Sequence, residues 1–197
     1  MNKIRLEISY KGTRNYIHGT SLYDEISKYL LEQYDSKTYV NSLVIRKFAH
    51  KACDLIITNT PPDNYFASCR INLSERNLSA YLVETDEKIK SRIEYDERPI
   101  QVATLVKDKS IIQQNQVVGY SPIEILVSMT KYLHYQIMPK PKIGIWVFVQ
   151  LDIERPLEKE GLFTVSIEQS IPGRFSASSI TQAGNHIGFI RFSVGQS

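Results

Sequence analysis

Cysteine, a surplus of one charge and long apolar runs are all scarce in this 197-residue sequence. Its two cysteines, Cys53 and Cys69, are too few for a disulfide framework. Its 24 basic side chains nearly balance 21 acidic ones, whereas dedicated nucleic-acid binders concentrate a basic surplus. No apolar run approaches the roughly 18 residues of a membrane span, and the N-terminal alternation is not that of a signal peptide. We therefore expect a cytoplasmic protein with reduced thiols that binds neither nucleic acid nor membrane.

Sequence signatures of several enzyme classes are also absent. None of the four histidines lies three or four residues from another, and neither cysteine has a neighbour with metal-ligand spacing, so no metal site is expected. There is no phosphate-binding loop, no dinucleotide-binding glycine fingerprint and no Gly-x-Ser-x-Gly elbow. We expect no cofactor.

The apolar residues that are present favour strands. The chain holds 24 Ile and 12 Val against only 7 Ala, together with 12 Tyr and 7 Phe. β-Branched and aromatic side chains suit a pleated sheet, whereas Ala suits helices. This composition predicts an α+β protein that is dominated by sheet and has few helices.

Two segments have the apolar spacing of helices. The first is expected from Thr20 or Ser21 to Tyr34, with Ser21 and Asp24 as a weak capping box. The second is expected over 122–138, because Ser121 is a good cap, Pro122 suits the first helical position and Glu124 completes a capping box. The remaining periodic segments predict strands at 4–10, 40–51, 55–58, 65–73, 78–84, 89–95, 100–106, 144–153, 162–169, 175–182 and 187–194, with a turn at 86–87.

The two halves of the chain contain similar segments in the same order. Ile26–Leu30 matches Met129–Leu133, and Leu78–Ala80 matches Phe175–Ala177. Chance also produces short matches in a chain so rich in Ile and Tyr. A duplication predicts two domains, 1–98 and 99–197, joined at Arg98-Pro99.

A strand, one long apolar helix and several further strands, in each half, resemble the hotdog fold. Two such halves resemble a double hotdog, in which two long helices are each wrapped by an antiparallel sheet and the halves pair edge to edge. Ile17-His18-Gly19, just before the first helix, is similar to the His-Gly pair that hotdog thioesterases and hydratases often carry there.

A looser resemblance is to hotdog proteins of the A-factor biosynthesis type. Ala49-His50-Lys51, and Ser121-Pro122 at the start of an apolar helix, are similar to motifs of that family. Further along that helix, the family has an acidic residue and an Arg-Gln pair, where this chain has Val127 and Thr130-Lys131. These differences argue against the family's synthase activity.

The hotdog resemblance implies a general acid–base pair that acts on an acyl thioester. His18 would be one member and Glu124 the other, while Gly19 and Thr20 would offer backbone N–H groups to the thioester oxygen. The alternatives are that His18 is a turn residue and that Glu124 serves only as the capping partner of Ser121.

Other charged residues give further candidates. Asp24 and Glu25 could be the carboxylates of a thioesterase, or simply first-turn acids favoured by the helix dipole. Arg46, beside Lys47, His50 and Lys51, together with Lys140 and Lys142, could bind the phosphates of coenzyme A or of a carrier protein's phosphopantetheine. The alternative for these cations is a solvated surface.

Two functions remain open. One is an enzyme acting on an acyl thioester of coenzyme A or of an acyl carrier protein, as a dehydratase, hydratase or thioesterase. The other is a non-catalytic protein that binds an acyl chain or a carrier protein, or scaffolds a biosynthetic complex. Either could form a homodimer.

Overall fold

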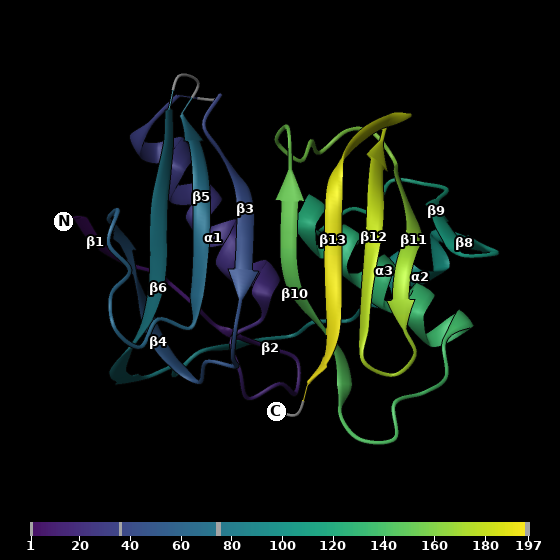
Figure 1. Cartoon of the computed structure of the whole chain (residues 1–197), viewed down its shortest axis with the longest axis horizontal. Coiled ribbons are helices and arrows are strands. Elements are labelled where there is room, and N and C mark those ends of the chain that lie inside the picture. Colours follow the sequence, from purple (N-terminus) through teal and green to yellow (C-terminus); the bar gives the residue numbers. More distant parts are fainter. Residues whose placement is uncertain (1, 36, 74–75, 196–197) are drawn as a thin grey trace. The chain divides into compact units, whose positions relative to one another are not determined.

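Alternating apolar segments form antiparallel strands in both of the units into which the chain divides. The computed structural model describes residues 2–35, 37–73 and 76–195. One compact unit extends to Tyr95 and the other begins at Asp96. Both units are drawn in Figure 1.

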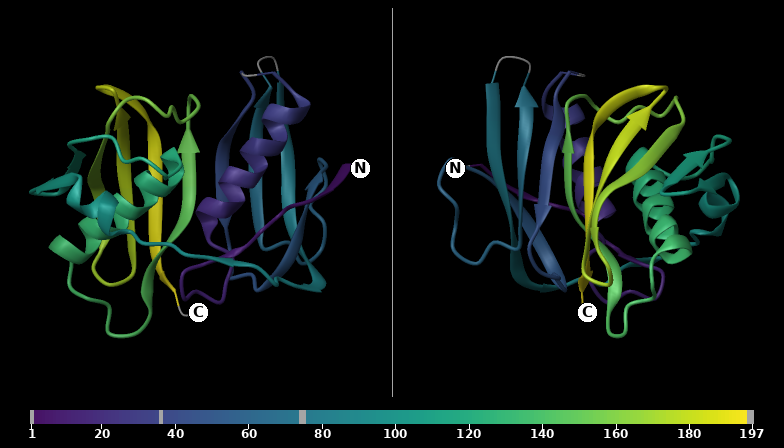
Figure 2. Two further views of the ribbon diagram at one scale, coloured as in Figure 1. Left: turned by 180° about the vertical axis from the view of Figure 1, so that it is seen from behind. Right: turned by 45° about the vertical axis from the view of Figure 1, so that its right-hand side comes forward.

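In the first unit, one long helix lies against an antiparallel sheet. Helix α1 (Gly19–Gln33) crosses one face of this sheet, as the left view of Figure 2 shows, and buries Leu22, Ile26 and Leu30 almost completely. The sheet has the order β1-β4-β6-β5-β3. Its strands are β1 (Asn2–Arg5), β3 (Tyr39–Ile45), β4 (Lys51–Ile57), β5 (Ala67–Leu73) and β6 (Arg76–Lys88).

A short parallel pair also forms within the first unit. Strand β2 (Tyr10–Lys11) lies alongside β7 (Arg92–Ile93), with Lys11 opposite Ile93. The Arg92 guanidinium donates to the carbonyls of Gly12 and Arg14, at 2.6 and 2.8 Å. These bonds hold the segment before α1 against the end of the unit.

The second unit has its own long helix and antiparallel sheet. Helix α3 (Pro122–Ile137) packs on the sheet through Ile123, Leu126 and Leu133, which are fully buried. A short helix, α2 (Arg98–Val102), precedes it. The order is β10-β13-β12-β11-β9-β8, with β8 (Thr104–Lys107), β9 (Ser110–Gln113), β10 (Ile145–Ile153), β11 (Phe163–Ile171), β12 (Phe175–Gln182) and β13 (Asn185–Gly195).

Both cysteines are core residues of the first unit. Cys53 is fully buried and Cys69 is 4% exposed. Burial raises the pKa of each thiol to about 12. Both cysteines therefore act as small buried hydrophobes, and neither thiol is suited to nucleophilic chemistry.

Several predicted boundaries are wrong. The first strand ends at Arg5 rather than Tyr10. The strand expected over 40–51 ends at Ile45, and β4 begins at Lys51 and includes most of the strand expected over 55–58. Strand β6 continues through the expected turn at Asp86-Glu87, because it stays paired with β4 there, with Lys51 opposite Lys88. The expected strand at 100–106 begins as helix α2, in which Pro99 occupies the first turn, where its fixed φ and missing N–H cost nothing.

The pairing of β10 with β13 requires a glycine at position 188. Its φ is +145°, and an added Cβ would lie 2.0 Å from the Asp152 carbonyl oxygen. We expect Gly188→Ala to lower the free energy of unfolding by about 3 kcal/mol, measured by urea denaturation. Gly173→Ala is the matched control, since Gly173 also has positive φ but has nothing within 4 Å of the new Cβ. Equal losses in both variants would contradict this explanation.

Candidate functional site

His18 lies at the N-terminus of α1 and is more buried than a turn side chain. It is the N-cap residue, its carbonyl accepts from Ser21 N at 2.9 Å, and its imidazole makes no capping bond. Only 8% of its surface is exposed. The backbone before it is anchored by Ile17 N, which donates to the Ala49 carbonyl at 2.7 Å. The imidazole is therefore held in place at the start of a helix.

A chain of side-chain hydrogen bonds supports this imidazole. Lys11 Nζ donates to Thr20 Oγ1 at 2.9 Å, and Thr20 Oγ1 lies 2.7 Å from His18 Nδ1. Thr20 is fully buried and Lys11 is 5% exposed. The Tyr95 ring completes the cluster, 5.2 Å from Lys11 Nζ and 5.8 Å from the His18 ring.

Lys11 and Tyr95 were missed by the sequence analysis. Neither belongs to a motif, and Tyr95 follows Lys11 by 84 positions in the sequence. The parallel β2–β7 pair brings their segments together. No sequence signal marks a two-residue parallel pairing.

The first N–H groups of α1 lie beside the imidazole. Gly19 and Thr20 open the helix, where backbone N–H groups have no intrahelical acceptor and the helix dipole is positive. Together with Lys11 they create an environment suited to an oxygen that carries negative charge.

Glu124 serves as a helix cap in the second unit. Its Oε2 accepts from Ser121 N at 2.9 Å, and Glu124 N donates to Ser121 Oγ at 3.3 Å. The predicted capping box is confirmed. The acid–base role of Glu124 stays a prediction.

The other candidate carboxylates lie deeper in helix α1 than expected. The helix begins at Gly19, so Asp24 and Glu25 fall in its second turn and no acid lies in the first. Both their interpretation as first-turn acids and the weak capping box of Ser21 with Asp24 are wrong, because the helix starts at Gly19 with His18 as its N-cap, before the expected start at Thr20 or Ser21. Both residues are half-buried.

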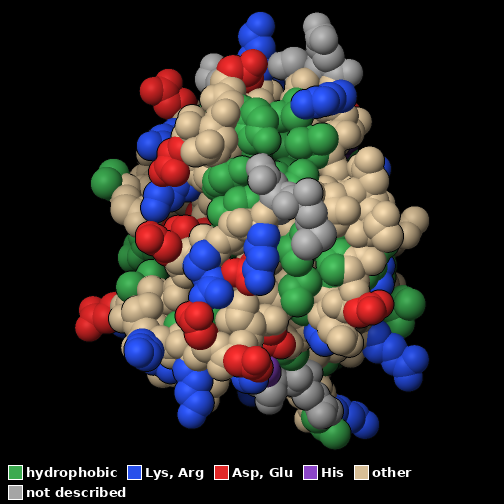
Figure 3. All heavy atoms as spheres, turned by 90° about the vertical axis from the view of Figure 1, so that its left-hand side faces the viewer, with side chains coloured by type: hydrophobic (Ala, Val, Ile, Leu, Met, Phe, Trp, Pro, Cys, Tyr) green, Lys and Arg blue, Asp and Glu red, His purple; other side chains and the backbone are tan. Residues whose placement is uncertain are grey.

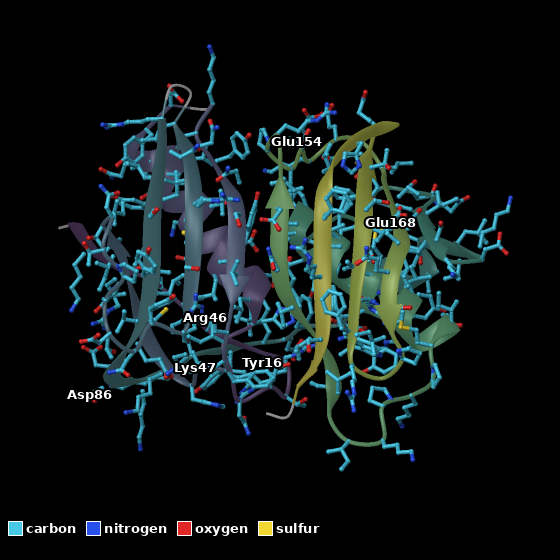
Figure 4. All side chains as sticks on the ribbon, in the orientation of Figure 1. Tyr16, Arg46, Lys47, Asp86, Glu154 and Glu168 are labelled. Atoms are coloured by element: carbon cyan, nitrogen blue, oxygen red, sulfur yellow. The ribbon has the colours of Figure 1, made fainter. Side chains whose placement is uncertain are left out.

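The candidate phosphate-binding cations are exposed. Arg46 follows β3 and lies over the Tyr65 ring, 4.5 Å from its centroid; Figure 4 labels it beside Lys47. Lys140 and Lys142 follow α3 and are exposed in the second unit. Figure 3 shows acidic and basic side chains mixed over the face that it draws, as the near-balanced charge leads one to expect.

The described residues hold no group of three or more His, Cys, Asp or Glu side chains that could bind a metal ion. In the same part of the chain, no helix is both long and apolar enough to span a membrane.

Comparison with known proteins identifies the fold. No family model and no curated protein matches the chain. Among solved structures, it is similar to the pyran synthase domain from module nine of the sorangicin pathway, with 9% identity, a TM-score of 0.53, and coverage of 95% of this chain and 92% of that one.

Two further solved structures align over most of the chain at lower TM-scores. The tesB protein of Mycobacterium avium subspecies paratuberculosis has a TM-score of 0.49 and 9% identity, and the alignment covers 97% of this chain and 92% of that one. The erythromycin dehydratase has a TM-score of 0.43 and 13% identity, and the alignment covers 98% of this chain and 89% of that one. With a long helix against an antiparallel sheet in each unit, and with the likeness to the sorangicin pyran synthase domain, the chain has the hotdog fold.

Proposed function

We propose that this protein acts on an acyl thioester, carried by coenzyme A or by an acyl carrier protein, with chemistry of the dehydratase or thioesterase kind. The observation that carries the proposal is the buried imidazole of His18 beside the first N–H groups of α1. The resemblance of Ile17-His18-Gly19 to the His-Gly pair of hotdog thioesterases and hydratases supports it.

The chemistry follows from what this environment stabilises. The N–H groups of Gly19 and Thr20 would bind the thioester oxygen as negative charge develops there. That charge arises when a proton leaves the carbon next to the carbonyl, as in dehydration, or when water attacks the carbonyl, as in hydrolysis. In the dehydration, the hydroxyl on the next carbon leaves with one added proton as water, so two proton-transfer groups are needed.

Glu124 is our proposed second proton-transfer group, and Arg46, Lys140 and Lys142 are proposed to bind the phosphates of the carrier. The pairing of His18 with Glu124 depends on a further proposal, that the two units form a double hotdog.

A non-catalytic binding protein is the second candidate. The capping box favours it, because it gives Glu124 a structural role that needs no substrate. Such a protein would bind the acyl chain or its carrier without converting it.

A ligand panel separates these functions. Acyl-coenzyme A and acyl-carrier thioesters should raise the melting temperature, and turnover should be seen as thiol release or as formation of an unsaturated thioester. Free coenzyme A and free fatty acid serve as controls for the two halves of the ligand. A shift without turnover would favour the binding protein, whereas no shift and no turnover with any thioester would refute the proposal.

A further inference from the structure

The hydroxyl proton of Thr20 has one hydrogen-bond acceptor among the described residues. A threonine hydroxyl donates one hydrogen bond and accepts two. Among the residues that the structure describes, Thr20 Oγ1 bonds only with Lys11 Nζ and His18 Nδ1. An ammonium group carries only donors, so the lysine gives its proton to Oγ1 and cannot receive one. The remaining partner for the Thr20 proton is His18 Nδ1.

Burial makes this direction of donation decisive. Thr20 is fully buried, so water does not offer its hydroxyl an alternative acceptor. A proton on His18 Nδ1 would face the Thr20 proton and leave one of the two without an acceptor. Buried donors without acceptors are rare because the desolvation cost is not recovered.

We infer that Lys11 and Thr20 act as positioning residues that fix the neutral His18 ring with its proton on Nε2. The imidazole then has Nδ1 occupied as an acceptor and carries its proton on Nε2. The order of donation runs from the ammonium to the hydroxyl and from the hydroxyl to the ring.

This tautomer assigns His18 a particular role, which rests on the proposed function. An Nε2–H group cannot take the proton next to the carbonyl in the resting enzyme. It can donate a hydrogen bond to an oxygen that gains negative charge, as the N–H groups of Gly19 and Thr20 can. His18 in this form can be the hydrogen-bond or proton donor of the proposed pair, and the base that removes the proton next to the carbonyl is then the other proposed group, Glu124.

Long-range 1H–15N correlation spectra of the ligand-free, full-length protein test the tautomer directly. At about pH 8, above the ordinary titration range of histidine, we expect the Nε2–H form of His18 to exceed the other roughly tenfold or more. His18→Gln assigns the signals by removing them. Dominance of the Nδ1–H form, or an even mixture, would overturn the inference.

Variants of Thr20 distinguish the effect of its hydroxyl on the tautomer from the effect of its side-chain shape. Thr20→Ser keeps the hydroxyl and should keep the Nε2–H form, whereas the nearly isosteric Thr20→Val should lose the strong preference. Lys11→Met should weaken it, because the hydroxyl regains a free choice of direction. An unchanged spectrum in folded Thr20→Val would refute the inference; if that variant does not fold, the wild-type and Thr20→Ser spectra decide.

The result is independent of the ligand panel. A dominant Nε2–H form in a protein that no thioester stabilises would leave the hydrogen-bond chain intact and refute the proposed function. Thioester turnover by a protein whose His18 carries its proton on Nδ1 would support the proposed function and refute the inferred tautomer.

Discussion

Replacing His18 with alanine is expected to lower acyl-thioester turnover about 100- to 10,000-fold, the usual contribution of a positioned proton-transfer or hydrogen-bonding group. Stability should fall as well, by about 1–2 kcal/mol, because the buried Thr20 hydroxyl loses its acceptor. Turnover and melting temperature, measured on the same samples, distinguish the two effects.

His50→Ala is the matched control for the loss of a histidine from the first unit. His50 Nδ1 lies 2.6 Å from the Asn15 carbonyl oxygen, at an exposed position. It should change turnover little. If His18→Ala keeps full turnover, or if His50→Ala loses as much, His18 is not part of the reacting site.

Glu124→Gln tests the proposed partner with the same assay. Glutamine can still accept from Ser121 N, so the capping box and the melting temperature should be retained. Loss of turnover in a stable variant would support proton transfer by Glu124. Full turnover would show that Glu124 serves only as a cap.

Acidification is expected to destabilise the second unit through His134. This residue of α3 is fully buried, and its ring stacks on Trp146 with centroids 4.6 Å apart. Burial lowers the pKa of His134 from 6.5 to about 4, against a smaller opposing effect of the Thr130 carbonyl. The folded protein therefore holds this ring neutral at a pH where the unfolded chain protonates it.

The direction of the pH effect follows from which state binds the proton. Between pH 6.5 and about 4 the unfolded chain binds a proton at His134 and the folded chain does not, so the free energy of unfolding falls as the pH falls. Above pH 6.5 this contribution is constant, and below about 4 the loss is complete. The shift corresponds to about 3 kcal/mol.

Denaturant unfolding over this pH range measures the effect. The double variant His134→Phe, Ser176→Ala removes the titrating ring together with the serine hydroxyl, whose Oγ lies 2.5 Å from His134 Nε2, so no buried partner is left behind. The difference between wild type and variant should follow the predicted curve. His186→Gln, at an exposed histidine, should leave the curve unchanged. A variant as acid-sensitive as wild type would contradict the prediction.

The main elements follow from local patterns. Both long helices were predicted, and the second from its first residue, because Ser121, Pro122 and Glu124 satisfy the helix terminus from within one turn. Strand β12 was predicted at its observed bounds, and β10, β11 and β13 within two residues, because their apolar residues alternate against a buried face. Predicted boundaries were wrong where pairing with a distant strand decided them, as where β4 pairs with β6 as far as Lys88.

The surroundings of the candidate site needed the tertiary structure. The sequence by itself determined that His18 precedes an apolar helix, because the periodicity of that helix is local. It could not place Lys11 and Tyr95 beside this histidine, since a two-residue parallel pair has no periodicity of its own. Nor could the sequence show that Thr20 is buried away from water, and this burial is what orients its hydroxyl. Burial and long-range pairing are properties of the folded chain, and they decide which nitrogen of His18 carries the proton.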